Sequence, residues 1–234
     1  MRRGHREEQQ NEGCSFLNNG GRFVRLFHPQ GDIVAGERTP DRRVQRTRLL
    51  LHKALISLIL EKKYESITVQ EILDRADVGR STFYTHFRDK DELLVGGLEN
   101  VKHLLQSSQA AAVAGSGKSY EKIIGFSLAM FEHGYEYRAV NRALLGSNAE
   151  AVVRRQIHSA LTTVVNQEVR TQLQKRKRSD YPVSPELLTH FLVSTYISVL
   201  TWWLQAKTHV TPKEIDEQYR HLVLPCLASV FGDH

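Results

Sequence analysis

Cysteine is scarce in this chain, which has two cysteines, Cys14 and Cys226, among 234 residues. Two cysteines cannot form a disulfide framework, and neither has neighbours at the spacing of a metal site. Among the eleven histidines, no order of Ser, His and Asp, no pair of carboxylates and no metal-binding cluster stands out. The sequence therefore predicts a cytoplasmic protein without a metal or other cofactor, and it does not point to an enzyme.

Long apolar runs are also missing, apart from residues 187–206. The N-terminus is charged and has no apolar segment of signal-peptide length. Residues 187–206 contain His190, Gln205 and six hydroxyl-bearing side chains, which favours a buried or interface helix over a membrane span. Neither an alternating strand pattern nor an internal repeat is present, so we expect an all-α fold and no membrane partner.

Acidic residues are outnumbered, since 32 Lys and Arg against 26 Asp and Glu give a net charge of +6. A basic chain suits a nucleic-acid partner, but residues 44–106 hold ten basic against nine acidic side chains. The informative charge is local, because Arg42, Arg43, Arg46 and Arg48 crowd the start of one helix. Contact with phosphates and an ordinary solvated helix end are both open interpretations of this cluster.

The pattern divides the chain near residues 40 and 90. Residues 1–40 are rich in Gly, Arg, Asn, Glu and Gln, and we interpret them as a poorly ordered extension; a basic arm that contacts DNA is the alternative. Apolar residues at helical spacing then fill residues 41–90 and 91–234. The expected helices are 41–62, a long one from Asp89 to Gln109, and 120–135, 138–146, 150–174, 185–207 and 212–231. Ser184 and the pair Thr211 and Glu214 mark the last two starts as caps.

Residues 68–90 predict two short helices separated by a tight turn. Thr68 and Glu71 have the spacing of a capping box, which starts the first helix. Asp77, Val78 and Gly79 then break it, because Asp and Gly tolerate turn conformations.

The second short helix has two contrasting faces. Phe83 and Phe87 lie four residues apart on one face, which we expect to be core. The opposite face carries Arg80, Ser81, Tyr84 and Thr85. Two helices joined in this way, the second with polar and aromatic side chains outward, are typical of a helix-turn-helix motif.

The stretch ALISLILEKKYESITVQEILDRADVGRSTFYTHFRDKDELL, Ala54 to Leu94, resembles the tetracycline-repressor (TetR) family of bacterial transcription regulators. Its most specific part is VGRSTFYTHFRDKDELL, which contains the core T-F-Y-x-H-F and places Lys90 six residues after Tyr84. The resemblance implies an N-terminal helix-turn-helix domain and a larger C-terminal helical domain for ligand binding and dimerisation. It further implies a repressor that binds a palindromic operator as a homodimer and is released by a small-molecule effector.

The resemblance also assigns DNA contacts to individual residues. The candidates are Gln70, Arg80, Ser81, Thr82, Tyr84, Thr85, His86 and Lys90. Arg80 offers a bidentate fork to guanine, while hydroxyls and Lys90 suit phosphate. Tyr84 as a side chain that packs over the domain edge, and His86 as a structural hydrogen-bonder, stay open as alternatives.

Three positions depart from the family pattern. Gly79 replaces the common serine N-cap, and Asp77 and Lys63 stand where glycines are usual. Asp adopts the left-handed conformation more readily than most residues, so we expect a slightly less stable domain of the same kind.

The larger domain offers candidates for a ligand pocket and a dimer interface. The residues expected to line an apolar cavity, each of them also suited to the core, are Phe126, Met130, Phe131, Tyr135, Tyr137 and Trp202. The residues expected at the interface or in the core are Leu192, Ile197, Val199, Leu200 and Trp203. The expected partners are double-stranded operator DNA, a second copy of the chain and a small-molecule effector.

Two rival functions remain beside this one. Residues 112–119 fit a relaxed phosphate-loop pattern of a nucleotide site, but the preceding residues favour a helix where such a loop needs a strand. The better rival is a helical DNA-binding or protein-interaction module without effector control. Residues 91–234 are more than dimerisation alone needs, which favours a regulatory domain.

Overall fold

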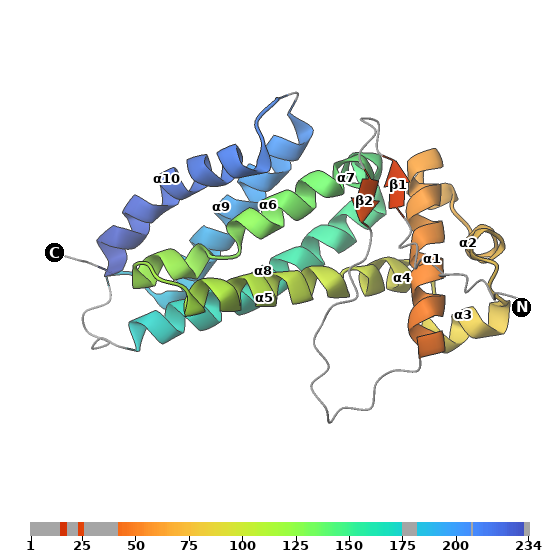
Figure 1. Cartoon of the computed structure of the whole chain (residues 1–234), viewed down its shortest axis with the longest axis horizontal. Coiled ribbons are helices and arrows are strands. Elements are labelled where there is room, and N and C mark those ends of the chain that lie inside the picture. Colours follow the sequence, from red (N-terminus) through yellow and green to blue (C-terminus); the bar gives the residue numbers. More distant parts are fainter. Residues whose placement is uncertain (1–14, 18–22, 26–41, 175–181, 207, 232–234) are drawn as a thin grey trace, which may run out of the picture. The chain divides into compact units, whose positions relative to one another are not determined.

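The computed structural model describes residues 15–17, 23–25, 42–174, 182–206 and 208–231. The chain divides into two units, residues 1–40 and residues 41–234. In the described part of the second unit, every regular element is a helix, from α1 to α10 with the 3-10 helices η1 and η2 between them (Figure 1). This confirms the helical fold class.

The described residues of the first unit form a small antiparallel hairpin. Strand β1 (Ser15–Leu17) pairs with β2 (Phe23–Arg25), and Phe16 lies opposite Val24. The sequence predicts no strand, and that prediction was wrong here because three-residue strands are too short to show an alternating pattern. The rest of residues 1–40, with the basic arm and the predicted disorder, lies outside the described residues.

The first helical core belongs to the N-terminal helices of the second unit. They are α1 (Arg42–Glu61), η1 (Tyr64–Ser66), α2 (Val69–Ala76), α3 (Arg80–His86) and α4 (Lys90–Gly97). Leu51, Ile72 and Phe83 are completely buried in it. Leu144 and Ala149, which come from later helices, complete the same core. These N-terminal helices, residues 42–97, are called the head, and they are anchored to the rest of their unit through apolar packing.

The long helix predicted from Asp89 to Gln109 is interrupted, so that prediction was wrong. Helix α4 ends at Gly97, and α5 (Glu99–Ala114) begins after Leu98. A Cβ atom on Gly96 would lie 3.0 Å from Phe87 Cε1, and one on Gly97 would lie 3.0 Å from His52 Nδ1. The two glycines allow α1 and α4 to approach closely, and they also weaken the helix at this point.

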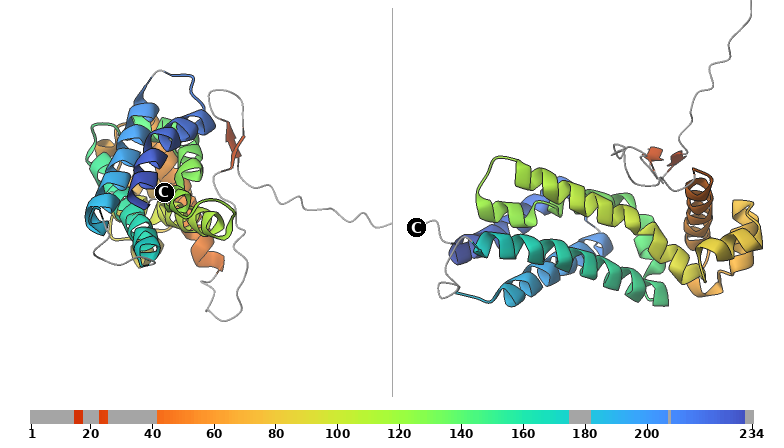
Figure 2. Two further views of the ribbon diagram at one scale, coloured as in Figure 1. Left: turned by 90° about the vertical axis from the view of Figure 1, so that its left-hand side faces the viewer. Right: turned by 90° about the horizontal axis from the view of Figure 1, so that it is seen from below.

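The second core is formed by the remaining helices. They are α5, η2 (Ser119–Ile124), α6 (Ser127–Glu136), α7 (Arg138–Leu144), α8 (Asn148–Leu173), α9 (Pro185–Gln205) and α10 (Pro212–Phe231). The helix predicted over 120–135 starts as the 3-10 helix η2 and becomes α-helical from Ser127, which corrects that prediction. Helix α9 packs against α8 on one side and α10 on another (Figure 2).

The caps predicted for the last two helices are confirmed. The Leu187 N–H donates to Ser184 Oγ at 3.2 Å. At the start of α10, the Thr211 N–H donates to Glu214 Oε2 at 2.7 Å and the Glu214 N–H donates to Thr211 Oγ1 at 3.3 Å. These reciprocal bonds satisfy N–H groups that a helix start leaves without partners.

Helix α9 is the described helix that is long and apolar enough, by composition, to cross a membrane. In this fold α9 contributes apolar side chains to the second core. Leu192, Val193 and Tyr196 are fully buried in the second core. Packing within the protein therefore accounts for part of its apolar character, while Leu187, Phe191 and Trp202 remain exposed.

Candidate nucleic-acid interface

The start of α2 has the predicted capping box. The Thr68 N–H donates to Glu71 Oε2 at 2.9 Å, and the Glu71 N–H donates to Thr68 Oγ1 at 3.3 Å. Lys62 forms an ion pair with Glu71, and this pairing with the bonds from Thr68 lowers the pKa of the Glu71 carboxyl to about 2. The first turn of α2 is therefore fixed both to its own cap and to the end of α1.

The turn between α2 and α3 depends on Asp77. Its φ of 53° and ψ of 48° place it in the left-handed region, as the sequence predicts. The Val78 N–H then donates to Leu73 O at 3.2 Å, which closes the end of α2. Gly79 caps α3 in an extended conformation without a side-chain hydrogen bond. This turn sets the direction in which α3 leaves α2.

Helix α3 has one buried and one exposed face, as predicted. Phe83 and Phe87 are buried, with their ring centroids 5.9 Å apart. Arg80, Ser81 and Thr85 are exposed on the other side. The buried pair anchors the helix, so the exposed residues can change without loss of the core.

Tyr84 is neither fully buried, like Phe83, nor fully exposed. Its ring meets the Phe83 ring edge-on at 5.3 Å, yet 49% of the residue is exposed. The Arg80 guanidinium carbon lies 5.9 Å from the centroid of the Tyr84 ring. Tyr84 therefore packs against the edge of the head and still presents surface, and its contact with Arg80 orders the two outward side chains together.

The other candidates on α2 and α3 are less free to reach DNA. Gln70 is exposed, but its amide donates to Asp74 Oδ1 at 2.8 Å. The Thr85 hydroxyl donates to Ser81 O at 2.9 Å. Thr82 and His86 are half-buried, and the His86 ring lies 6.3 Å from that of Phe87. A phosphate would have to compete with these internal contacts.

Lys90 is held more firmly than any of these. Its ammonium donates to the carbonyl oxygens of Tyr64 at 2.8 Å, Ile67 at 2.8 Å and Glu65 at 3.3 Å. The Tyr64 hydroxyl in turn donates to Asp91 Oδ1 at 2.5 Å, and burial together with this carboxylate raises the pKa of Tyr64. All three ammonium hydrogens have acceptors, so a phosphate contact requires Lys90 to give up an internal bond.

Charge on the head is distributed unevenly. On the side where α1 meets α2, Arg75 forms two bonds to Glu61, at 2.6 Å and 2.7 Å, and this pairing lowers the pKa of Glu61. Among the described ion pairs, neither Arg46 nor Arg80 has a carboxylate partner, and both side chains are exposed. Arg46 at the start of α1 and Arg80 on α3 thus carry positive charge that none of the described ion pairs compensates. The side chain of Arg42 lies outside the described residues.

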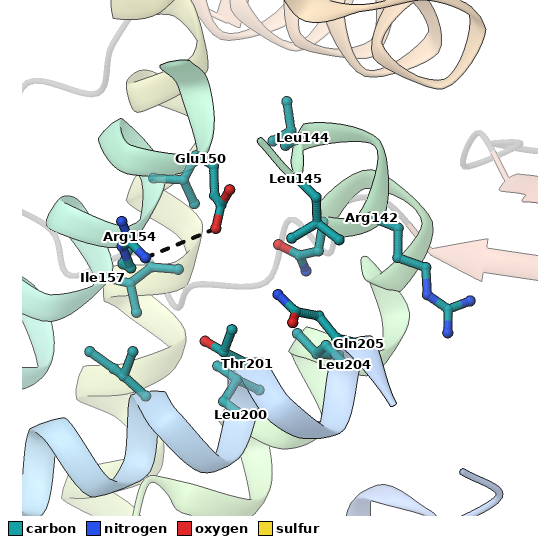
Figure 3. Close-up of a pocket in the computed structure, with 13 residues that line it drawn as sticks. Arg142, Leu144, Leu145, Glu150, Arg154, Ile157, Leu200, Thr201, Leu204 and Gln205 are labelled. Carbon is teal, nitrogen blue, oxygen red and sulfur yellow. Dashed lines mark ion pairs between the residues drawn. The ribbon is translucent and has the colours of Figure 1, made fainter. Parts of the chain in front are cut away.

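The structure disperses the residues proposed for a ligand pocket. Phe126, Met130 and Phe131 are buried in the second core, Tyr137 is half-buried, and Tyr135 and Trp202 are about half exposed. A described pocket lies elsewhere, between α7, α8 and α9 (Figure 3). Its lining is outside the stretch from Ala54 to Leu94, and it comes from three separate helices. The sequence offers no local signal for it.

The candidates for a dimer interface are also divided. Leu192 and Trp203 point into the second core, and Leu200 is buried beside them, while Ile197 and Val199 are half-buried. The large apolar side chains that α9 and α10 do expose are Leu187, Phe191, Trp202 and Leu222. The exposed set on α9 has helical spacing, but α9 is apolar on nearly every face, so its sequence pattern does not separate outward from inward residues.

The segment that fits a phosphate-loop pattern is helical before its glycines. Helix α5 continues to Ala114, and η2 begins at Ser119. A phosphate loop requires a strand that enters it and a helix that leaves it. The geometry of residues 112–119 therefore gives no support to a nucleotide site.

Comparison with known proteins links the two helical parts to one family. Residues 51–95 match the model described as "Bacterial regulatory proteins, tetR family", and residues 121–224 match "Transcriptional regulator C-terminal region". The uncharacterized HTH-type transcriptional regulator YxbF of Bacillus subtilis (strain 168) is 44% identical over 78 residues. That match covers 31% of this chain and 20% of the Bacillus protein, so the chain spans about a fifth of that relative's length.

Solved structures of similar fold cover most of the chain. A TetR-family transcriptional regulator from Syntrophomonas wolfei str. Goettingen superposes with a TM-score of 0.66 and 18% identity, over 81% of this chain and 99% of the other. NalD of Pseudomonas aeruginosa, described as the secondary repressor of the MexAB-OprM multidrug efflux pump, gives a TM-score of 0.58 and 17% identity, over 81% and 100%. At these identities the likeness concerns the fold.

Proposed function

Because this chain belongs to the TetR family and is a helix-turn-helix transcription regulator, we propose that it is a repressor that binds a palindromic operator as a homodimer. We place it in the cytoplasm and assign it no catalytic step. The observation that carries the proposal is the exposed surface of α3, formed by Arg80, Ser81 and Tyr84 above the buried Phe83. Phe83 anchors this surface to the core, and Arg80 gives it a positive charge.

The chemistry of the α3 surface suits the edges of base pairs. An Arg side chain can form two hydrogen bonds to guanine in the major groove. Tyr84 offers a hydroxyl and an apolar ring beside it, which suit a phosphate and a thymine methyl group. Arg46 on α1 adds positive charge for the phosphate backbone.

A homodimer explains the exposed apolar residues on the last two helices. Leu187, Phe191 and Trp202 on α9, with Leu222 on α10, carry no charge and remain between 41% and 67% exposed in one subunit. Burial of such side chains stabilises association. A twofold axis would present two α3 helices to successive major grooves about 34–36 Å apart, on an inverted repeat.

We infer control by a small molecule because the second helical part is larger than dimerisation needs and contains a pocket. A pocket lies where α7 and α8 meet α9, next to the reading head. A ligand that binds one arrangement of the dimer more tightly than another shifts the population of the two. We infer that the chain represses transcription when no ligand is bound and leaves the operator when the ligand binds.

Selection of bound sequences from random DNA by the purified full-length protein tests this function. We expect an inverted repeat whose half-site centres lie one helical turn apart, about 10–10.5 base pairs, or a multiple of that spacing. Recovery of sequences without any shared motif would contradict the proposal. Recovery of a single unrepeated half-site would contradict the dimer.

A further inference from the structure

The pocket between α7, α8 and α9 has walls from both helical cores (Figure 3). Leu144 belongs to the core of the reading head, and Val153 packs against that core. Leu200 and Leu204 belong to the second core, and Ile157 packs against it. Seven of the thirteen lining residues are Leu, Val or Ile. The pocket is therefore an apolar space at the junction between the two cores.

A second, polar hollow continues from this pocket along the same helices. The two hollows share Arg154 and Ile197. The polar end is lined by Arg154, Arg155 and His158 from α8 and by the hydroxyls of Ser194 and Ser198 from α9. Its lining contains no carboxylate. From Ser194 to Gln205 the combined groove follows twelve residues of α9, a length of about 16 Å at the helical rise.

Glu150 does not cancel the positive charge of the polar end. Its Oε1 lies 4.0 Å from the Arg154 guanidinium, and its Oε2 accepts a hydrogen bond from the Gly146 N–H at 2.8 Å. In Figure 3 the Glu150 carboxylate and the Arg154 guanidinium face each other at the rim. The Arg154 side chain is 59% exposed, so an incoming anion can replace this long contact.

We propose that this groove binds an amphipathic organic acid, with its apolar tail between Leu144 and Leu200 and its carboxylate at Arg154, Arg155 and His158. This inference rests on the proposed function, because it names the chemical class of the effector. A carboxylate accepts two parallel hydrogen bonds from an Arg side chain, and the hydroxyl of Ser194 can donate a further bond to it. The tail excludes water from the apolar end, where burial of each methylene group is favourable.

The position of the groove supplies a route to the reading head. Leu144 ends α7, which packs against α1, and the head is also tied to the start of α8, where the Asn148 N–H donates to Glu65 Oε1 at 3.0 Å. A tail that separates Leu144 from Leu200 changes how the head sits on the second core. The acid then favours the arrangement with the wider groove, and DNA affinity changes with that population.

Direct binding to the full-length protein tests the site without any DNA. The probe is decanoate, below its micellar concentration, with decan-1-ol and decylamine as matched compounds of other charge, measured by calorimetry. We expect decanoate to bind and the other two to bind at least ten-fold more weakly. Arg154→Gln and Arg155→Gln should each weaken decanoate binding by roughly ten-fold or more. Lys213→Gln, which removes a distant positive charge on α10, should leave it unchanged.

A second variant tests the apolar part. Ile197→Trp places a large ring where the two hollows meet and should abolish decanoate binding, while circular dichroism shows an unchanged helical content. Absence of decanoate binding, or equal binding of decanoate and decan-1-ol, overturns the site. Binding that appears only in a monomeric variant such as Trp202→Asp also overturns the site, because it would mean that the partner subunit fills the groove in the wild-type dimer.

The effect on DNA separates this inference from the proposed function. Decanoate should weaken binding to the selected operator at least five-fold in the wild-type protein and leave Arg154→Gln unaffected. A protein that prefers a palindrome but ignores decanoate keeps its proposed function and loses this inference. A protein that binds decanoate but shows no DNA sequence preference loses the proposed function instead, and with it the effector role.

Discussion

The ammonium group of Lys90 lies 2.8 Å from the carbonyl oxygen of Ile67, on the segment that leads into α2. Tyr64 contributes a second carbonyl oxygen at 2.8 Å, and the centroid of its ring is 4.6 Å from the same ammonium. Lys90 thus ties the first turn of α4 to η1. This position sits at the start of α4 as the family resemblance implies, yet its charge is directed into the protein.

Lys90→Met should therefore lower the free energy of unfolding of the protein. The substitution keeps the apolar stem but leaves the carbonyl oxygens of Tyr64, Glu65 and Ile67 without their donor, at a cost of about 1–3 kcal/mol. We expect a lower midpoint in urea denaturation. The salt dependence of DNA binding, measured where the variant is fully folded, should remain that of the wild-type protein.

Lys90→Gln provides the matched control, since its amide can restore part of the bonding. We expect an intermediate stability for it. Lys90→Met could instead leave stability unchanged and lower the slope of DNA affinity against salt concentration by about 0.9, the value for one phosphate. That result would support the phosphate contact that the resemblance implies.

His52 gives the reading head a dependence on pH. The residue is 9% exposed, and its ring meets the Phe87 ring edge-on at 5.8 Å. Burial, with the nearby Arg48 charge adding to it, lowers the pKa of His52 from 6.5 to about 4. The unfolded chain therefore takes up a proton near pH 6.5, whereas the folded chain takes it up only near pH 4.

The free energy of unfolding should fall as the pH decreases from 6.5 towards 4, by about 3 kcal/mol over the whole interval from this group. Above that interval His52 contributes no slope. His52→Gln should have a flatter profile of stability against pH, with a residual slope from His133, whose pKa burial also lowers to about 4. Parallel profiles of variant and wild type would exclude His52 as a source of the acid sensitivity.

Trp202 and Leu222 test the dimer interface, because they are 59% and 67% exposed in one subunit. Trp202→Asp or Leu222→Asp should convert the dimer to a folded monomer, since an unpaired carboxylate in a buried interface is costly. Sedimentation velocity measures the change. Lys213→Asp on the exposed side of α10 serves as the control and should remain dimeric, and dimers in all three variants would place the interface elsewhere.

The local features of the head are the part that sequence predicts best. The Thr68 and Glu71 box, the left-handed Asp77 and the buried Phe83 each depend on residues within a few positions of one another. Such signals are chemical properties of short segments. They are enough to establish α2, the turn and α3.

What the sequence does not predict depends on contacts between distant segments. The bonds of Lys90 are made to residues 23 to 26 positions earlier. The break after Gly97 reflects the close approach of His52, and the outward face of α9 is decided by which neighbours cover Leu192 and Trp203. The groove between α8 and α9 likewise exists only once the helices are packed.

The central claim is that α3 reads DNA with one face and holds the fold with the other. Phe83 is completely buried, so Phe83→Ala should destabilise the head by about 3–5 kcal/mol. Arg80→Ala combined with Tyr84→Ala should leave the free energy of unfolding within about 0.5 kcal/mol of the wild type, since both side chains are exposed.

The most direct measurement is the ratio of affinities for the selected operator and a scrambled duplex, determined by fluorescence anisotropy at one salt concentration for the wild type and the Arg80→Ala, Tyr84→Ala variant. We expect each removed contact to cost about 1–3 kcal/mol of discrimination, so that the ratio falls at least ten-fold while the dimer stays folded. An unchanged ratio in a folded double variant would contradict the account.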